Sequence, residues 1–77
     1  MIKQGSIVKA KAGRDKDGFF VVIRMEGKYA FIADGKRRKV QLPKKKKLIH
    51  LQKTNSLAEK YSTNREIKNT IREFGGL

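Results

Sequence analysis

Residues 19–35 read FFVVIRMEGKYAFIADG, and they carry the strongest indication of the fold class. Phe19–Met25 is rich in the Phe, Val and Ile residues that favour strands, and it is apolar enough to be covered on both faces. Residues 26–28 form a short turn, after which Tyr29–Ala33 predicts a strand that pairs back on the first. Asp34-Gly35 then favours a second tight turn, because both residues tolerate left-handed backbone. The stretch therefore predicts antiparallel β-structure.

Alternating patterns on either side predict further strands. Residues 6–12 place Val and Ala on one face and Lys on the other, which is the period of a half-buried strand. Arg38–Leu42 alternates in the same way, Pro43 ends that strand, and Leu48–Gln52 predicts the last one. A mainly β protein with five short strands favours an SH3-like barrel, because closing the sheet hides its edges. The side chains expected in the core are Val8, Ala10, Phe20, Val22, Ile32, Val40, Leu42, Ile49 and Leu51.

The last part of the chain predicts a helix. Thr63 and Glu66 have the spacing of a capping box, in which each side chain bonds to the backbone of the other residue. Apolar side chains then recur at helical spacing, at Ile67, Ile71 and Phe74. An isolated helix of about twelve residues is marginal in water, so this apolar stripe needs a surface to lie on, either the barrel or a partner.

Length and composition indicate one small, strongly basic unit. The 77 residues include 20 Lys and Arg against 7 Asp and Glu, which gives a formal net charge of +13 at pH 7. Self-repulsion at this charge opposes compaction unless a polyanion compensates it, so nucleic acid and anionic membrane are the two classes of partner to separate. A hydrophobic content of 38% argues against a disordered basic tail. We expect a barrel over residues 1–53, a linker over 54–62 and a helix over 63–74.

Three stretches of the chain resemble a known sequence pattern. Residues 5–16, GSIVKAKAGRDK, followed by a glycine and a Phe-Val-Val-Ile strand, resemble a KOW motif. Residues 33–39, ADGKRRK, and 43–46, PKKK, look like the continuation found in KOW-domain proteins of the large-subunit ribosomal protein fourteen-e type and their small bacterial relatives. The resemblance covers residues 3–53. It implies an SH3-like barrel that binds ribosomal RNA, with its motif loop next to the phosphate backbone.

The motif loop, residues 13–18, departs from the family pattern at one position. Its characteristic residues are Gly13, Asp17 and Gly18, and the family glycine commonly stands where this chain has Asp17. Asp adopts left-handed backbone at a modest cost, so the loop shape can be kept. The carboxylate also makes the potential at this point more negative.

Basic residues gather in three places that a barrel could bring together: the motif loop, residues 36–39 and residues 44–47. Charge runs in ordinary proteins are solvated and aid solubility, but the net charge of this short chain favours polyanion binding. Arg holds a phosphate in a bidentate manner or stacks on a base, whereas Lys acts as a mobile point charge. The residues expected to bind RNA are Lys9, Lys11, Arg14, Lys16, Arg24, Lys36, Arg37, Arg38, Lys39, Lys44, Lys45, Lys46 and Lys47.

Phe19, Tyr29 and Arg24 could contact RNA, but each also has a purely structural interpretation. Phe19 and Tyr29 could stack on unpaired bases, but core packing is the expected use in a barrel with few large apolar residues. Arg24 could equally be an exposed strand residue opposite a cross-strand partner. Recognition of RNA through shape and backbone is therefore expected, and not the reading of base sequence.

Several functions are excluded by what the sequence lacks. No run reaches the roughly 18 apolar residues of a membrane span and the N-terminus lacks a secretory signal, so we expect a cytoplasmic protein with no membrane role. Cysteine is absent and His50 is the single histidine, so no metal site is expected. The carboxylates lie in turns or in the capping box, and Gly13 and Gly18 lack the spacing of a nucleotide-binding loop. We expect no catalytic residues, no cofactor and no small-molecule substrate.

These observations together predict an RNA-binding protein, ribosomal or ribosome-associated, that contacts ribosomal RNA through basic loops. Two alternatives remain open. One is an SH3-like module that binds proteins of the translation or transcription machinery, with the C-terminal helix as the docking element. The other is a protein that binds DNA without sequence specificity, which follows from charge alone.

Overall fold

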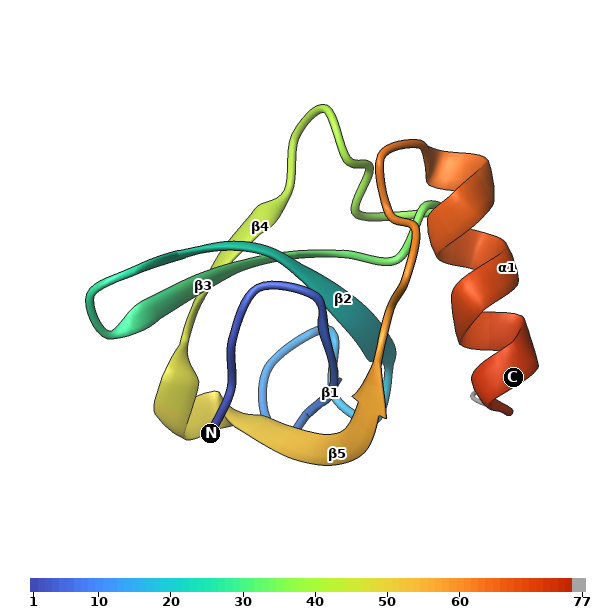
Figure 1. Ribbon diagram of the computed structural model, residues 1–77. Helices are drawn as coiled ribbons and strands as arrows, with labels where there is room; N and C mark the ends of the chain where they lie inside the picture. Colours follow the sequence, from blue (N-terminus) through green and yellow to red (C-terminus); the bar gives the residue numbers. More distant parts are fainter. Residues whose placement is uncertain (76–77) are drawn as a thin grey trace.

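The computed structural model describes residues 1–75 and consists of one antiparallel sheet with a C-terminal helix (Figure 1). Its elements are β1 Ser6–Ala10, β2 Phe19–Glu26, β3 Tyr29–Ala33, β4 Lys44–Lys47, the 3-10 helix η1 Leu48–His50, β5 Leu51–Leu57 and α1 Asn64–Phe74. The strand order across the sheet is β4-β3-β2-β1-β5. The sheet is strongly curved and resembles a barrel (Figure 1). It is not closed, because within the described residues no ladder joins the edge strands β4 and β5. The expected mainly β fold with a C-terminal helix is confirmed.

The first half of strand β2, residues 19–23, is covered on both faces, as its composition predicts, whereas Arg24 and Glu26 are exposed. One face lines the interior of the curved sheet, in a cluster made of Val8, Ala10, Phe20, Val22, Ala30, Ile32 and Leu51. The other face packs under α1, in a second cluster made of Ile7, Val21, Ala33, Ile67 and Ile71. The apolar stripe of α1 therefore lies on the sheet of its own chain.

The start of α1 follows the predicted capping box. The Thr63 hydroxyl accepts a hydrogen bond from the Glu66 backbone N–H at 3.2 Å, and a Glu66 carboxylate oxygen accepts one from the Thr63 N–H at 3.2 Å. Gly75, in left-handed backbone, ends the helix. Among residues 1–75 the structure contains no helix with the length and apolar character needed to cross a membrane.

The expected strand Arg38–Leu42 is wrong, because residues 34–43 form a loop and the fourth strand is Lys44–Lys47. An Asp34 carboxylate oxygen accepts hydrogen bonds from the backbone N–H groups of Lys36 and Arg38, each at 2.9 Å, so the chain closes on itself here instead of turning back as a hairpin. A β-ladder uses backbone groups, so a lysine run can pair with β3 at the edge of the sheet. Lysines at an edge also oppose pairing with another chain.

This shift changes the core. Leu42 is 81% exposed and Ile49 is 73% exposed, so both were wrongly expected to be buried, and Val40 is only half-buried beneath α1. The other expected core residues are buried. Strand β5 begins at Leu51 and not at residue 48, because η1 turns the chain first, and it continues over residues 54–57 that were expected in the linker.

Candidate nucleic-acid interface

The motif loop is a compact turn fastened by backbone hydrogen bonds. The Asp17 N–H donates to the Ala10 carbonyl at 2.8 Å, and the Gly18 N–H donates to the Asp15 carbonyl at 3.0 Å. Asp17 has a φ of 70°, in the left-handed region that favours glycine. Aspartate adopts this backbone at a modest cost, so the turn can carry a side chain at this position.

The two glycines of the motif loop are needed for different reasons. Gly13 has a φ of 83°, which strains any residue with a Cβ. A Cβ on Gly18 would lie 3.1 Å from the Asp15 carbonyl oxygen and 3.0 Å from Cε1 of Phe20, so Gly18 is needed for space. The loop can therefore pack closely on the end of the sheet.

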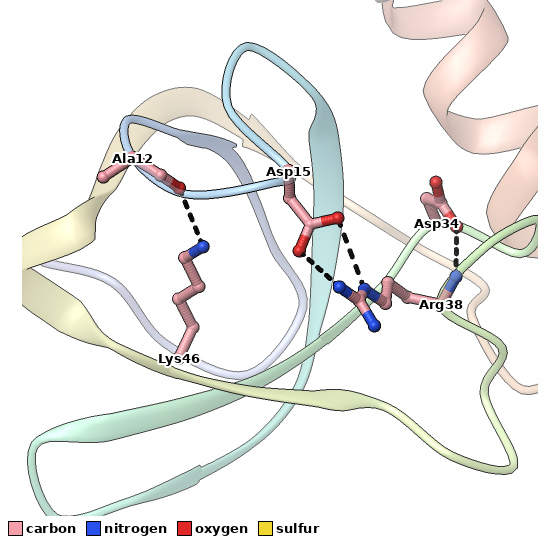
Figure 2. Close-up of polar contacts among 5 residues, drawn as sticks. All are labelled: Ala12, Asp15, Asp34, Arg38 and Lys46. Atoms are coloured by element: carbon pink, nitrogen blue, oxygen red, sulfur yellow. Dashed lines mark hydrogen bonds and ion pairs between the residues drawn. The ribbon is translucent and has the colours of Figure 1, made fainter.

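A bidentate ion pair joins the motif loop to residues 34–43 (Figure 2). Nη2 of Arg38 donates to Oδ2 of Asp15 at 2.9 Å, and Nε donates to Oδ1 at 3.3 Å. The Asp15 side chain is only 2% exposed and that of Arg38 is 27% exposed. The Arg38 guanidinium, expected to bind RNA, is thus engaged by a buried carboxylate and holds two loops together.

A second contact joins β4 to the chain just before the motif loop (Figure 2). Nζ of Lys46 donates a hydrogen bond to the Ala12 carbonyl at 2.8 Å. It would also lie 3.1 Å from a Cβ placed on Gly13, so the ammonium group reaches the start of the loop itself. Lys46 is therefore a tether between two basic segments.

The N-terminus of α1 supports residues 34–43 from the other side. Oδ1 of Asn64 accepts a hydrogen bond from the Val40 N–H at 2.7 Å, and Nδ2 donates to Oε1 of Gln41 at 2.8 Å. Gly35 lies against the same turn, because a Cβ there would be 2.5 Å from the Asn64 carbonyl oxygen. The helix thus acts as a brace for a basic loop, a role that neither charge nor motif indicated.

Three segments carry most of the expected RNA-binding cations: residues 11–18, which include the motif loop, residues 34–43, and β4. We call them the joined basic segments. Eight of these cations are exposed, and the hydrogen bonds and ion pairs within residues 1–75 do not use their side chains. They are Lys11, which directly precedes Ala12, together with Arg14, Lys16, Lys36, Arg37, Lys39, Lys44 and Lys47. The structure therefore connects the three basic stretches by two short contacts and leaves the other cations at the surface.

The remaining three expected cations make contacts with other side chains. Nζ of Lys9 is 3.8 Å from an Asp17 carboxylate oxygen, so the added negative charge of the motif loop is partly matched. Arg24 and Lys45 lie on the outer face of β2 and β4, over the aromatic ring of Phe31 and the ring of Tyr29 respectively. The expected set is therefore divided between two surfaces.

Phe19 and Tyr29, for which base stacking and core packing were both considered, lie in different surroundings. Phe19 packs against the α1 cluster, with its ring centroid 5.3 Å from that of Phe74 in an edge-to-face arrangement, so core packing is confirmed there. Tyr29 belongs to neither apolar cluster and is only half-buried, so core packing is wrong for it.

Positive charge also gathers at the N-terminus. The side chain of Lys53, by a hydrogen bond and by its charge, lowers the pKa of the Met1 amine below its usual value, and desolvation and the charge of Lys3 add to the effect. These groups lie outside the joined basic segments. His50 lies directly before β5 and is half-buried in η1. Among the described residues no three histidine or carboxylate side chains gather where a metal ion could bind.

Some residues that shape this site were not predicted. Asp15 was interpreted only as a turn residue, because opposite charges on separate loops carry no pairing information in one sequence. Asn64 resembled an ordinary residue of the first helical turn. A signal for Phe31 does exist, since it alternates with Tyr29 and therefore lies on the same face of β3.

Comparisons with known proteins do not assign this chain to a family. No protein-family model matches this chain, and a search of curated proteins finds no match. The KOW resemblance therefore stays a prediction from the motif residues, and the function is argued from the surface itself.

Proposed function

We propose that this protein binds ribosomal RNA through the phosphate backbone, using the joined basic segments. The observation that supports this most is the pair of contacts, Arg38 to Asp15 and Lys46 to Ala12, that join three cation-bearing segments. Cations on connected loops can follow an irregular phosphate backbone, and each neutralised phosphate releases condensed counterions. The KOW resemblance supports RNA over other polyanions. The proposal includes a cytoplasmic location, where ribosomes are available.

Affinity for RNA is expected to depend steeply on salt. If about five phosphates are neutralised, the affinity for irregular or single-stranded RNA should fall about a hundredfold between about 50 and 200 mM salt. Anisotropy of a labelled ribosomal RNA fragment, titrated at several salt concentrations, measures this slope. A flat salt dependence would contradict backbone binding.

Two pairs of variants with equal charge loss test the location of the site. The double variant Arg14→Gln, Lys16→Gln should bind the same fragment about tenfold more weakly and reduce the salt slope by about two, because two phosphate contacts are lost. The control Lys60→Gln, Arg72→Gln removes two exposed cations outside the joined basic segments and should leave the slope unchanged. If both pairs weaken binding equally, net charge and not these segments binds RNA.

Association with ribosomes is the second expected result. The protein should sediment with ribosomes at low salt and be released at high salt; if it stays at the top of the gradient under both conditions, the ribosomal part of the proposal fails. Competition between structured ribosomal RNA and duplex DNA at physiological salt decides the DNA alternative. Tighter binding to the duplex would favour it.

One observation favours the protein-interaction alternative. Leu42 and Ile49 are large apolar side chains exposed to solvent, although single exposed apolar residues are common at protein surfaces. The double variant Leu42→Ser, Ile49→Ser separates the two functions. If it keeps its affinity for RNA but no longer sediments with ribosomes, a protein contact through these residues is required.

A further inference from the structure

The outer face of β2, β3 and β4 carries two aromatic rings in contact with cations. The strand register pairs Phe31 with both Arg24 and Lys45, and it pairs Tyr29 with Lys47. Side chains of directly paired residues lie on the same face of a sheet, so these groups share one surface. We call this surface the aromatic–cation face, formed by Arg24, Tyr29, Phe31, Lys45 and Lys47.

The contacts on this face are short. Cζ of Arg24 is 3.9 Å from the centroid of the Phe31 ring, and Nζ of Lys45 is 4.5 Å from the centroid of the Tyr29 ring. A cation at such a distance over a ring is attracted to its π-electrons. Phe31 therefore holds the Arg24 guanidinium in place, which lowers the entropy that this side chain would lose on binding a ligand.

The two rings are not used to build the core. Tyr29 and Phe31 are half-buried and belong to neither apolar cluster. Helix α1 packs on the part of the sheet that carries Val21 and Ala33, whereas Figure 1 shows the β2–β3 hairpin extending away from α1. Large aromatic side chains that do not fill a core and are not covered by the helix have a surface free for a ligand.

The charge of this face selects an anionic ligand. The face carries three cations, Arg24, Lys45 and Lys47, and one carboxylate, that of Glu26. The Glu26 carboxylate is exposed and lies 3.8 Å from Nζ of Lys45. Aromatic rings and guanidinium planes are the groups on which unpaired nucleobases stack, and cations beside them neutralise the phosphates. A single-stranded nucleic acid matches both properties.

Strand β4, which is one of the joined basic segments, also contributes Lys45 and Lys47 to the aromatic–cation face. Successive side chains of a strand point to opposite faces, and here Lys46 reaches Ala12 whereas Lys45 reaches the Tyr29 ring. An RNA chain on the joined basic segments could therefore continue over the edge of the sheet onto the aromatic–cation face.

We propose that the aromatic–cation face binds an unpaired segment of RNA, with nucleobases stacked on Tyr29 and on the guanidinium of Arg24. Lys45 and Lys47 contact its phosphates, and Glu26 opposes binding by repulsion. The inference rests on the proposed function and deepens it, because the joined basic segments by themselves contact backbone only. It gives the protein a preference for RNA with unpaired bases over a fully paired helix.

Tyrosine fluorescence tests the stacking directly. The chain has two tyrosines and no tryptophan, so in the variant Tyr61→Phe the only emitting tyrosine is Tyr29. The hydroxyl of Tyr61 accepts one exposed hydrogen bond, from Gln4 at 3.3 Å, so this change removes little. Titration with a short oligouridylate should quench the emission of Tyr29 saturably, over the concentration range in which anisotropy reports binding, because a stacked base quenches the ring.

Two controls separate stacking from charge. In the variant Tyr29→Phe the remaining tyrosine is Tyr61, whose emission should not change on binding, although the protein still binds the oligonucleotide through a ring at position 29. Inorganic polyphosphate supplies the charge without bases, so it should bind to the Tyr61→Phe variant without quenching Tyr29. Quenching of Tyr29 by polyphosphate would contradict base stacking.

Affinity provides a second, independent readout. The variants Tyr29→Leu and Phe31→Leu keep apolar volume but remove the ring, and each should weaken oligouridylate binding about tenfold. Their affinity for polyphosphate should be unchanged, and a circular dichroism spectrum that matches the parent's checks that the proteins are folded. Glu26→Gln should strengthen oligouridylate binding.

The outcomes distinguish this inference from the function on which it rests. If the oligonucleotide binds but the emission of Tyr29 is unchanged at saturation, or the leucine variants bind as tightly as the parent, the face is not the site and the proposed function stands. If the parent protein binds no RNA at low salt, the proposed function itself fails.

Discussion

Replacing Gly35 with Ala should lower the free energy of unfolding by about 3 kcal/mol. Gly35 has a φ of 81°, and left-handed backbone costs a residue with a Cβ about 1 kcal/mol. The new Cβ would also lie 2.5 Å from the Asn64 carbonyl oxygen, so the basic loop or the start of α1 must move, at a typical overpacking cost of about 2 kcal/mol. A domain of this length has a total stability of roughly 4–12 kcal/mol, so the variant should be marginal. Chemical denaturation followed by circular dichroism measures the change.

The variant Gly27→Ala is the matched control. Gly27 also has a positive φ, of 58°, but a Cβ there would meet nothing within 4 Å. It should cost about 1 kcal/mol, the backbone part alone. An equal decrease in the free energy of unfolding for Gly27→Ala and Gly35→Ala would show that residues 34–43 do not pack on α1.

The second large effect is expected at Ile67. This side chain is completely buried between α1 and the sheet, so Ile67→Ala should cost about 3 kcal/mol through lost apolar burial and the cavity that remains. Chemical denaturation followed by circular dichroism measures this change as well. Because Asn64 at the start of α1 holds Val40 and Gln41, loosening the helix should also weaken RNA binding at a temperature where the protein is still folded.

Ile49→Ala is the control for this substitution. The same atoms are removed from a side chain that is 73% exposed, so the free energy of unfolding should change by less than about 0.5 kcal/mol. A loss at Ile49 as large as that at Ile67 would restore the core expected from the alternating pattern and would contradict the observed packing.

The parts of the fold that were predicted correctly depend on neighbours in the chain. The strand Tyr29–Ala33, the start of β2 at Phe19 and the capping box at Thr63 follow from residue type and spacing within a few positions. The left-handed geometry of Asp17 belongs to the same class, since it is a property of one residue in a short turn.

The prediction of a strand at residues 38–42 was wrong, although the side chains there do alternate between apolar and polar, because these residues pair with no neighbouring strand. The Asp34 carboxylate closes the chain locally, and the free edge of β3 pairs instead with Lys44–Lys47. Such a choice compares a local hydrogen-bond arrangement with a pairing between distant segments, so alternation in one sequence cannot decide it.

The candidate site shows the same division. Composition and the resemblance to a KOW motif identified which stretches are basic, but the partners of Arg38 and Lys46, a buried carboxylate and a backbone carbonyl, lie 23 and 34 positions away in the chain. Lys45 was predicted as a phosphate ligand of a basic run, and its position over the Tyr29 ring could not be predicted from that run.

Composition and short-range pattern are enough to identify a small, basic, mainly β protein and the residues that carry its charge. Which cations are engaged within the protein and which face solvent depends on the folded arrangement of the chain. The same holds for the position of α1 behind the basic loop and for the two aromatic rings outside the core. These features depend on the pairing register and on contacts between distant segments, where a shift of one residue exchanges the faces of a strand.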